Sequence, residues 1–280
     1  MDNKKIEYGL YNNRIPYLIR RGSGEPSIIV FEPSRELIKS LVYRADSIVK
    51  TYNKILPSNC SLCVLGYDPG MPEKYTDEQI AGDFAEIIEK KFKPGIVIGI
   101  SYGGAVAIPF AALYPRFTTK LVLLVSAYAA SPKGVELMKE FMELIKDDNT
   151  YKALQKFNSL YLSWFYRTVS TLLTFLKRRS ILLHKNPPST FINSYTRIMN
   201  SNGSNKKYLP SIDVPALIIG GDRDQFFSGE LFEETAKLIP KGKAVVLKNG
   251  GHYVILEKLK EVKKILNDFI ESDQPVEKKV

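Results

Sequence analysis

Residues 94–107 read PGIVIGISYGGAVA. An apolar run, which predicts a buried strand, breaks at a glycine-rich pentapeptide centred on Ser101 and then continues as small residues suited to a helix. This pattern places Ser101 on a tight corner between strand and helix. Because Gly99 and Gly103 carry no Cβ atoms, the two backbones can approach closely and lift the serine hydroxyl above the sheet edge. We therefore predict that Ser101 is an accessible nucleophile.

A serine hydroxyl becomes a strong nucleophile only when a base accepts its proton, and histidine commonly has this role. The chain contains two histidines. His252 follows two glycines that come after the apolar run of residues 244–247, so a loop at the end of a strand can bring its ring over Ser101. His184 stands at the end of a predicted helix, where a capping or solvent-exposed histidine is the commoner arrangement. The pattern therefore predicts His252 as the base.

The base needs a carboxylate to orient it, and two aspartates follow the predicted strand of residues 215–220. Asp222 stands at the very end of the strand, and Asp224 comes three residues after Gly221. Asp224 is our first candidate. Asp222 is the reserve candidate, and its alternative role is a turn residue that hydrogen-bonds its own backbone.

These residues resemble the α/β-hydrolase superfamily, in its serine-nucleophile branch of capped esterases and hydrolases. In that family the triad runs serine, acid, histidine along the chain, and the acid commonly stands three residues after a glycine that ends its strand. The resemblance implies Ser101 as nucleophile, Asp224 as acid and His252 as base. A serine at this corner argues against the dehalogenase and epoxide hydrolase branches, which use an aspartate there.

Patterns along the rest of the chain are similar to the same family. Strands are predicted at residues 5–11, 14–21, 27–31, 61–65, 95–100, 120–125, 215–220 and 244–247, and helices at 37–56 and 76–92. Strands that alternate with helices imply a parallel sheet covered on both faces. The resemblance implies a mostly parallel eight-stranded sheet with an inserted helical cap. We expect a catalytic domain at 1–130 and 208–273, the cap at 131–207 and a polar tail at 274–280.

Two local features refine this fold. Thr76 and Gln79 have the spacing of a capping box, which predicts the start of a helix at Thr76. Pro109 falls inside the helix that follows the nucleophile, where it removes one backbone hydrogen bond and predicts a kink.

An oxyanion hole is expected from two backbone amides. The N–H of Tyr102 opens the helix after the nucleophile, and the resemblance implies that the N–H of Ser34 is the second donor. Where family members commonly have His-Gly, this chain has Glu32 and Pro33. A carboxylate so near an oxyanion slows acyl transfer unless Arg35 or another cation neutralises it. Glu32 and Arg35 are therefore candidate substrate-binding residues.

The segment between the predicted strands at 120–125 and 215–220 sets the expected specificity. It shows helical patterns at 134–146, 150–162, 168–183 and 188–199, and this segment resembles the family's cap. Residues 131–210 hold 13 Lys and Arg against 5 Asp and Glu, and residues 149–210 contain no acidic residue. The same segment is rich in aromatic and aliphatic residues, among them Trp164 and Phe165, which we take as candidate substrate contacts.

Three interpretations of this basic, apolar segment stay open. The apolar residues can form the core of the cap while Lys and Arg reach into water, which is the most usual arrangement. They can line an apolar acyl pocket with a cationic rim for an anionic substrate. They can also form a surface that contacts anionic lipid weakly.

Composition is ordinary for a globular protein. The chain has 280 residues, 44% of them hydrophobic and 25% charged, with a formal net charge of +10. No apolar N-terminal segment or membrane-spanning run is visible, so we expect a cytoplasmic protein. Cys60 lies just before the predicted core strand at 61–65 and Cys63 lies within it, so ordinary packing is the expected role, and the sequence suggests no metal or other cofactor. No nucleic-acid-binding motif accompanies the positive charge.

These observations predict a serine hydrolase that cleaves a carboxylic ester of a small-molecule acyl substrate, apolar or anionic, through an acyl-enzyme. A thioesterase, lipase, lactonase, amidase, peptidase or carbon–carbon hydrolase on the same triad stays open, because pocket shape selects the leaving group. A binding protein that keeps the fold without catalysis is the alternative from another class.

Overall fold

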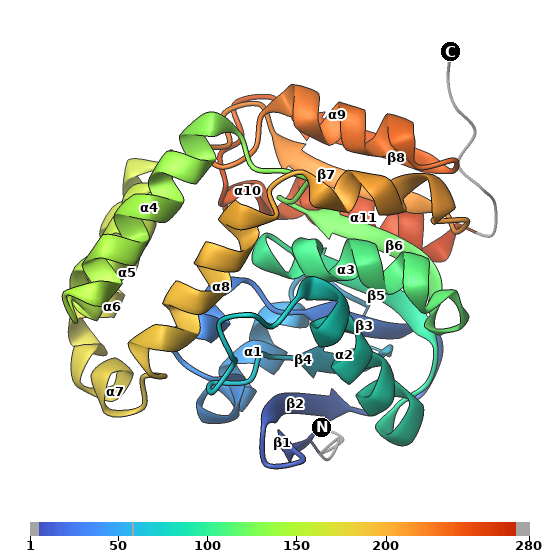
Figure 1. The fold of residues 1–280 in the computed structure, drawn as a ribbon. Helices are drawn as coiled ribbons and strands as arrows, with labels where there is room; N and C mark the ends of the chain where they lie inside the picture. Colours follow the sequence, from blue (N-terminus) through green and yellow to red (C-terminus); the bar gives the residue numbers. More distant parts are fainter. Residues whose placement is uncertain (1–5, 58, 273–280) are drawn as a thin grey trace.

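The computed structural model describes residues 6–57 and 59–272, so residue 5, residue 273 and the predicted tail at 274–280 lie outside the described part. Its centre is one eight-stranded sheet (Figure 1). The strands are β1 (Ile6–Tyr11), β2 (Ile15–Arg20), β3 (Ser27–Phe31), β4 (Ser61–Leu65), β5 (Gly95–Ile100), β6 (Thr118–Leu124), β7 (Ala216–Gly221) and β8 (Gly242–Leu247). Their order is β1-β2-β4-β3-β5-β6-β7-β8. β2 runs opposite to the other seven strands, so its pairings with β1 and β4 are antiparallel and the remaining five are parallel, which confirms the predicted mostly parallel sheet.

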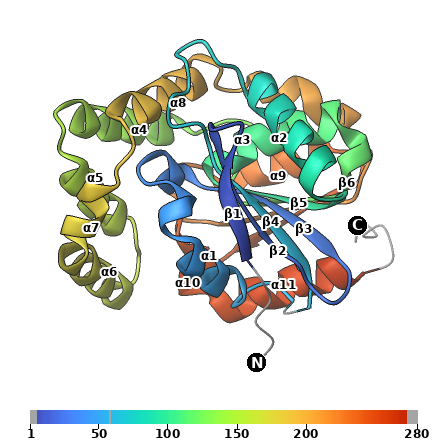
Figure 2. The ribbon, with the colours of Figure 1, turned by 90° about the horizontal axis from the view of Figure 1, so that it is seen from below.

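Helices cover both faces of the sheet, as predicted, and Figure 2 shows the two layers. One face carries α2 (Asp77–Lys91), α3 (Tyr102–Leu113) and α9 (Gly229–Leu238). The other carries α1 (Ala45–Tyr52) and α11 (Leu259–Glu271), with the short α10 (Val254–Glu257) before it. Strands buried on both faces read as continuous apolar runs, which is why the strand at 95–100 could be predicted from its residues.

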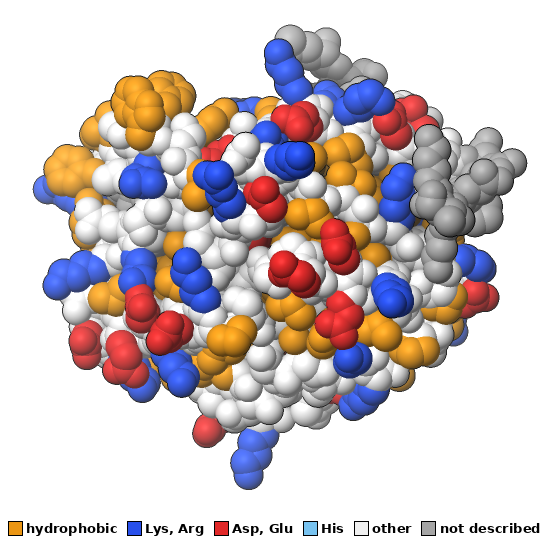
Figure 3. Space-filling view, turned by 90° about the horizontal axis from the view of Figure 1, so that it is seen from above, with side chains coloured by type: hydrophobic (Ala, Val, Ile, Leu, Met, Phe, Trp, Pro, Cys, Tyr) orange, Lys and Arg blue, Asp and Glu red, His pale blue; other side chains and the backbone are white. Residues whose placement is uncertain are grey.

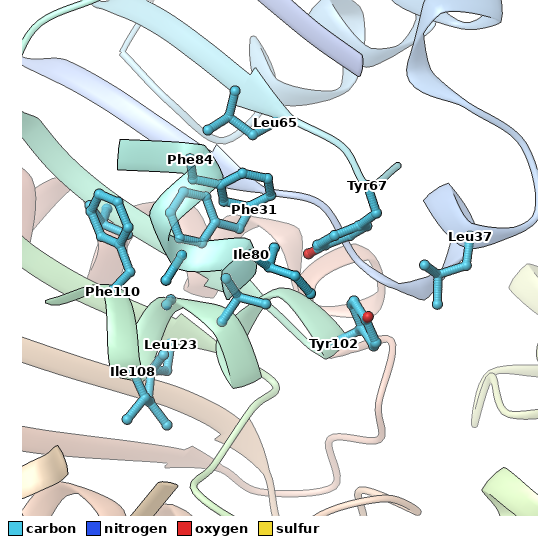
Figure 4. Close-up of a cluster of buried hydrophobic side chains, with 14 of the residues drawn as sticks. Phe31, Leu37, Leu65, Tyr67, Ile80, Phe84, Tyr102, Ile108, Phe110 and Leu123 are labelled. Carbon is cyan, nitrogen blue, oxygen red and sulfur yellow. The ribbon is translucent and has the colours of Figure 1, made fainter. Parts of the chain in front are cut away.

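Aromatic packing holds α2 and α3 against the sheet beside the nucleophile corner. Phe31, at the end of β3, packs edge-on against Phe84 of α2 and Phe110 of α3, with ring centroids 4.6 and 5.1 Å apart (Figure 4). All three side chains are fully buried or nearly so. Edge-to-face pairs contribute about 0.5–1.5 kcal/mol each beyond the area they bury. This cluster fixes the start of α3 relative to the end of β3.

The helical insertion occupies the predicted cap, between β6 and β7, and lies at the left of Figure 1. It consists of α4 (Pro132–Lys146), α5 (Thr150–Ser159), α6 (Trp164–Leu176), α7 (Arg178–Leu183) and α8 (Pro188–Asn200). The helix predicted at 168–183 is two helices, because the backbone leaves helical geometry at Lys177 (φ −92°, ψ 4°). Short 3₁₀ turns follow the insertion at Ser204–Ser211 and occur elsewhere at Ser34–Leu37, Leu41–Tyr43 and Pro115–Phe117.

The prediction of one long helix at 37–56 was wrong. Only residues 45–52 form an α-helix, and two 3₁₀ turns precede it. The N–H of Leu41 donates to the side chain of Glu36, at 2.8 Å, instead of to a helical carbonyl. A buried carboxylate thus competes with the backbone and interrupts the helix. The capping box at Thr76 and Gln79 is confirmed, with both of its reciprocal hydrogen bonds formed.

Of the three interpretations of the apolar residues in the cap, the most usual one, in which they form the core of the cap, does not hold for α6. In α6, Trp164 is 75% exposed and Leu176 is 64% exposed. Thr174, at 7% exposure, is the only buried residue of α6. Periodicity predicted the helix correctly, but it does not say which of two faces meets the protein.

Pro109 lies inside α3, and the helix continues through it from Tyr102 to Leu113. Proline has no N–H to donate to the carbonyl of Ala105, four residues earlier. The side chain of Asn205, from the turn after the insertion, donates to that carbonyl at 2.8 Å. The hydrogen bond lost to Pro109 is therefore replaced from outside the helix.

Candidate active site

Ser101 occupies the corner between β5 and α3 with φ 50° and ψ −115°. Non-glycine residues rarely adopt positive φ, so the corner stores strain that the surrounding packing must hold. A Cβ on Gly99 would lie 2.7 Å from the Cα of Gly104, and one on Gly103 would lie 2.2 Å from the carbonyl oxygen of Phe31. The glycines at both positions are thus required by close backbone contacts, as the sequence predicts.

His252 meets Ser101 across 151 residues of chain. The serine Oγ lies 2.9 Å from Nε2 of His252, and Nδ1 of the same ring lies 2.9 Å from Oδ2 of Asp224. The Asp224 side chain is fully buried, and its Oδ1 accepts hydrogen bonds from the N–H groups of Phe226 and Phe227. These bonds hold the carboxylate in place, so that the imidazole is oriented from one side and faces the hydroxyl on the other.

The alternative candidates lie elsewhere. Asp222 accepts a hydrogen bond from the N–H of Gly250 at 3.2 Å, so it joins the two loops of the site without a hydrogen bond to the His252 ring. His184 follows α7 and stacks on Tyr43, with ring centroids 4.4 Å apart. The geometry brings together Ser101, His252 and Asp224.

The two predicted oxyanion donors open neighbouring segments. Tyr102 is the first residue of α3 and Ser34 is the first residue of the 3₁₀ turn after β3, so neither amide has an acceptor within its own helix. The start of α3 packs directly on the end of β3, since a Cβ on Gly103 would lie 3.0 Å from the carbonyl oxygen of Glu32. Their role as a pair of donors stays a prediction.

The carboxylate of Glu32 is buried in a polar cluster beneath this turn. Tyr52 donates to its Oε1, and the guanidinium of Arg44 lies 3.4 Å from its Oε2. The same Arg44 pairs with Glu36 at 2.7 Å. The cation that neutralises Glu32 is thus Arg44 rather than Arg35, its neighbour in sequence.

Two carboxylates share one arginine in this cluster. Burial raises the pKa of Glu36 to about 8, against the opposing effect of Arg44. Arg35 itself is exposed, and it forms no ion pair within the described part of the chain. The protein packed around the Arg35 guanidinium removes water from part of it, and this desolvation lowers the pKa of Arg35; the positive charge of Arg44 lowers it further.

A small cavity with a volume of about 40 Å³ opens beside Ser101. Its lining includes Ser126, Met138, Tyr195 and Phe226. Sequence reasoning found none of these four, because they come from separate elements that only the fold brings together. Trp164 and Phe165, which we predicted as substrate contacts, are 75% and 56% exposed and do not line this cavity.

Arg197 of α8 is a further residue that the sequence did not single out. Its guanidinium pairs with Asp77 at the start of α2, at 2.9 Å, and bonds the hydroxyl of Tyr102. The Arg197 and Asp77 side chains are 8% and 7% exposed. Burial raises the pKa of Asp77, and Arg197 opposes this rise. The insertion is therefore joined to the residue next to Ser101 by a buried charge pair. The sequence carries no signal for Arg197, because a buried arginine cannot be told from the exposed lysines and arginines of the same basic segment.

The site combines a serine on a strand-to-helix corner, a histidine on a loop after the last strand and a buried aspartate. Together with the order of the strands, this arrangement defines an α/β-hydrolase architecture. The match of the alpha/beta hydrolase fold family to residues 57–259 shows that the chain belongs to that family.

Distant relatives include lipases. The chain is 28% identical to the monoacylglycerol lipase ABHD6 of Bos taurus over 240 residues, which span 78% of this chain and 70% of the relative. It is 25% identical over 169 residues to Lipase 1 of Psychrobacter immobilis, covering 58% of this chain and 51% of that lipase.

Solved structures share the fold. An α/β hydrolase enzyme from a Medee basin deep-sea metagenome library, MGS-M2, matches with a TM-score of 0.76 and 19% identity, over 98% of this chain and all of that one. The enol-lactonase from Burkholderia xenovorans LB400 matches with a TM-score of 0.74 and 17% identity, over 95% of this chain and all of that one.

Proposed function

We propose that this protein is a serine hydrolase that cleaves carboxylic esters through an acyl-enzyme. The observation that carries the proposal is the 2.9 Å contact between Ser101 Oγ and His252 Nε2, with Asp224 on the other ring nitrogen. A nucleophile and a base within hydrogen-bond reach, with a third group that orients the base, is the arrangement that activates a serine.

In the proposed reaction Ser101 Oγ attacks the ester carbonyl carbon while His252 Nε2 takes the hydroxyl proton. The amides of Tyr102 and Ser34 donate to the oxyanion that forms on the carbonyl oxygen. Collapse breaks the bond to the leaving alcohol, which receives the proton from His252. Water then repeats the attack on the acyl-enzyme, and the carboxylic acid leaves.

The position of Glu32 supports this reaction. Its side chain is bound by Tyr52 and Arg44, so its negative charge is balanced within the cluster under the turn. The carbonyl oxygen of Glu32 accepts a hydrogen bond from Tyr67 at 2.7 Å, which fixes the backbone just before Ser34. Because the charge of Glu32 is balanced and its backbone is fixed, Glu32 can position the N–H of Ser34 without destabilising the oxyanion electrostatically.

The test is labelling by a fluorophosphonate probe together with hydrolysis of p-nitrophenyl esters from acetate to palmitate. Wild type is expected to label and turn over esters, and Ser101→Ala to do neither while unfolding at the same temperature. Ser126→Ala is the matched control, because this serine lines the same cavity, whereas the hydrogen bond to His252 Nε2 found among the described residues is made by Ser101. A folded wild type that neither labels nor hydrolyses any ester of the series would refute hydrolysis and favour a binding role.

The small cavity beside Ser101 favours short or medium acyl groups. The lipases among the relatives, and the exposed apolar face of α6, favour lipid esters as a second candidate substrate. An optimum at acetate or butyrate supports short or medium acyl groups, and an optimum at decanoate or longer supports lipid esters.

Arg35, exposed and without an ion pair within the described residues, supports an anionic substrate. In that case a carboxylate on the acyl chain lowers KM, less so at high salt.

A further inference from the structure

The polarity of α6 is reversed relative to an ordinary surface helix. Its exposed face carries Trp164 (75% exposed), Phe165 (56%), Leu172 (55%), Leu173 (46%), Phe175 (46%) and Leu176 (64%). A helix on a globular protein normally buries its apolar stripe and presents polar residues to water. Here the protein side of the helix is the polar one.

Hydrogen bonds show that this orientation is specific. Asn158, buried on α5, donates to Thr174 Oγ1 at 2.9 Å and accepts from Ser170 Oγ at 2.7 Å. Ser170 and Thr174 are four residues apart, so they lie on one face of α6. Rotation of α6 that buried its leucines would break both bonds and leave Asn158 unsatisfied in the interior. The polar contacts therefore keep the apolar face outward.

The apolar face continues onto α7 and is bordered by positive charge. Leu182 and Leu183 are 43% and 76% exposed. Lys177, Arg178 and Arg179 lie between the two apolar groups, and within residues 6–57 and 59–272 none of the three pairs with a carboxylate. Figure 3 shows large hydrophobic side chains with Lys and Arg beside them at the upper left, over the helical insertion.

We propose that α6 and α7 form a docking surface for an anionic lipid membrane, on which α6 lies in the interface with its apolar face in the lipid. An exposed apolar helix face next to unpaired cations, with no acidic residue between 149 and 210, matches an interface that is apolar inside and negatively charged at its surface. Within the described residues no helix is long and apolar enough to cross a membrane. The proposed contact is one in which α6 lies on the surface of the bilayer.

A second copy of this chain is the competing occupant of the face. A symmetric contact that buries the apolar groups of both α6 and α7 has its two-fold axis near the junction of the two helices, and there Lys177, Arg178 and Arg179 of one copy face the same three residues of the other. Like charges at an interface oppose association, whereas anionic headgroups attract them. Charge thus selects the membrane over a dimer.

The docking surface adjoins the site. Tyr161, three residues before α6, stacks on Tyr253, with ring centroids 4.0 Å apart. A Cβ on Gly251, next to His252, would lie 2.8 Å from Leu162. The N–H of Ser163, the N-cap residue directly before α6, donates to Glu257 Oε1 at 2.6 Å. Docking of α6 would therefore place the loop of His252 near the lipid surface.

Trp164 is the only tryptophan of the chain, so its fluorescence reports on this surface alone. The experiment titrates full-length protein, in the Ser101→Ala background, with vesicles of phosphatidylcholine alone or with 30% phosphatidylglycerol, and measures emission and quenching by brominated lipid. Because nothing is hydrolysed, the result is independent of the proposed esterase activity. We expect a blue shift, quenching, and binding at least tenfold tighter to the anionic vesicles, since each Lys or Arg near such a membrane strengthens binding about fivefold.

Two matched variants test the charge. Lys177→Glu/Arg179→Glu is expected to weaken binding to anionic vesicles about 25-fold or more. Lys260→Glu/Lys263→Glu changes two exposed lysines of α11, which pair with no carboxylate in the part of the chain that the structure describes, by the same total charge and is expected to leave binding unchanged. Leu172→Ser/Leu176→Ser tests the apolar contribution and is expected to abolish quenching by brominated lipid. No change of Trp164 emission with either vesicle overturns the proposal, as does equal binding to both vesicles. A concentration-dependent blue shift without lipid, with a dimer in sedimentation velocity, overturns it in favour of a second copy.

Discussion

The buried pair of Arg197 and Asp77 gives a quantitative prediction about how the insertion is held. Arg197→Met keeps most of the apolar stem and removes the charge, so the carboxylate of Asp77 stays behind at 7% exposure without its cation. Removal of one partner of a buried ion pair costs about 3–5 kcal/mol. The variant also loses the hydrogen bond to the Tyr102 hydroxyl. We expect Arg197→Met to lower the free energy of unfolding at pH 7 by about 4 kcal/mol.

The loss should depend on pH. Burial raises the pKa of Asp77 above its usual 3.8, and without Arg197 it rises further. A carboxyl with a raised pKa in the folded state contributes stability that is fully present below its unfolded pKa and is lost as the pH rises through the folded pKa. The destabilisation by Arg197→Met should therefore be large at pH 7 and shrink toward pH 4.

Urea unfolding followed by circular dichroism at pH 7 and pH 4.5 measures this effect. Arg197→Met/Asp77→Asn is expected to recover most of the lost stability at pH 7, because no uncompensated charge stays buried. Arg116→Met is the control, since its partner Glu89 lies 2.7 Å away on the surface and such pairs contribute less than about 1 kcal/mol. A loss of under about 1 kcal/mol in Arg197→Met, or a double variant as unstable as the single one, would refute the reasoning.

Three further predictions concern the site and its supports. Asp224→Asn should lower kcat about 10³–10⁴-fold in ester hydrolysis, whereas Asp222→Asn should change it less than about threefold, and the reverse ranking would make Asp222 the acid. Glu36→Gln should remove a pH dependence of stability. With the pKa of Glu36 at about 8, the contribution of this carboxyl to the free energy of unfolding is complete below about pH 4.5 and is lost as the pH rises through 8. In urea titrations between pH 5 and 8, the free energy of unfolding of wild type should therefore fall, relative to that of the variant, by up to about 1.4 kcal/mol per pH unit. Parallel curves for the two proteins would show that Glu36 is ionised throughout. Asn205→Ala should lower the free energy of unfolding by about 1–3 kcal/mol because the carbonyl of Ala105 is left without a donor, and a variant as stable as wild type would show that water replaces the side chain.

The order of elements and the residues that meet at the site were predictable because their signals are local. The glycines around Ser101, the glycines before His252 and the position of Asp224 after Gly221 each follow from a tight turn at a strand end. Parallel strands bring such turns to one edge of the sheet. The structure adds the distances, and the catalytic roles of these residues stay predictions.

What could not be predicted depends on contacts between distant segments. The cation for Glu32 comes from Arg44, twelve residues away, because the 3₁₀ turns fold that arginine back, whereas sequence proximity favoured Arg35. Likewise, the helical period at 164–176 indicates a helix with an apolar stripe, but Asn158 on another helix decides that the stripe faces outward. Buried polar residues determined both outcomes, and their partners are not visible in a local pattern.

The bond between Asn205 and the carbonyl that Pro109 leaves open has a consequence for building chimeras. A chimera that takes its helical insertion from a relative needs two junctions, and the start of α4 and the end of α8 are the natural positions for them. In this chain the segment after α8 supplies the hydrogen bond that the backbone of α3 lacks at Pro109. A chimera that replaces residues 201–211 therefore needs a side chain with an amide N–H at position 205. Otherwise position 109 needs a residue other than proline, whose backbone N–H can donate to the carbonyl of Ala105. Pro109 and Asn205 therefore have to be kept or exchanged together, although 96 positions separate them.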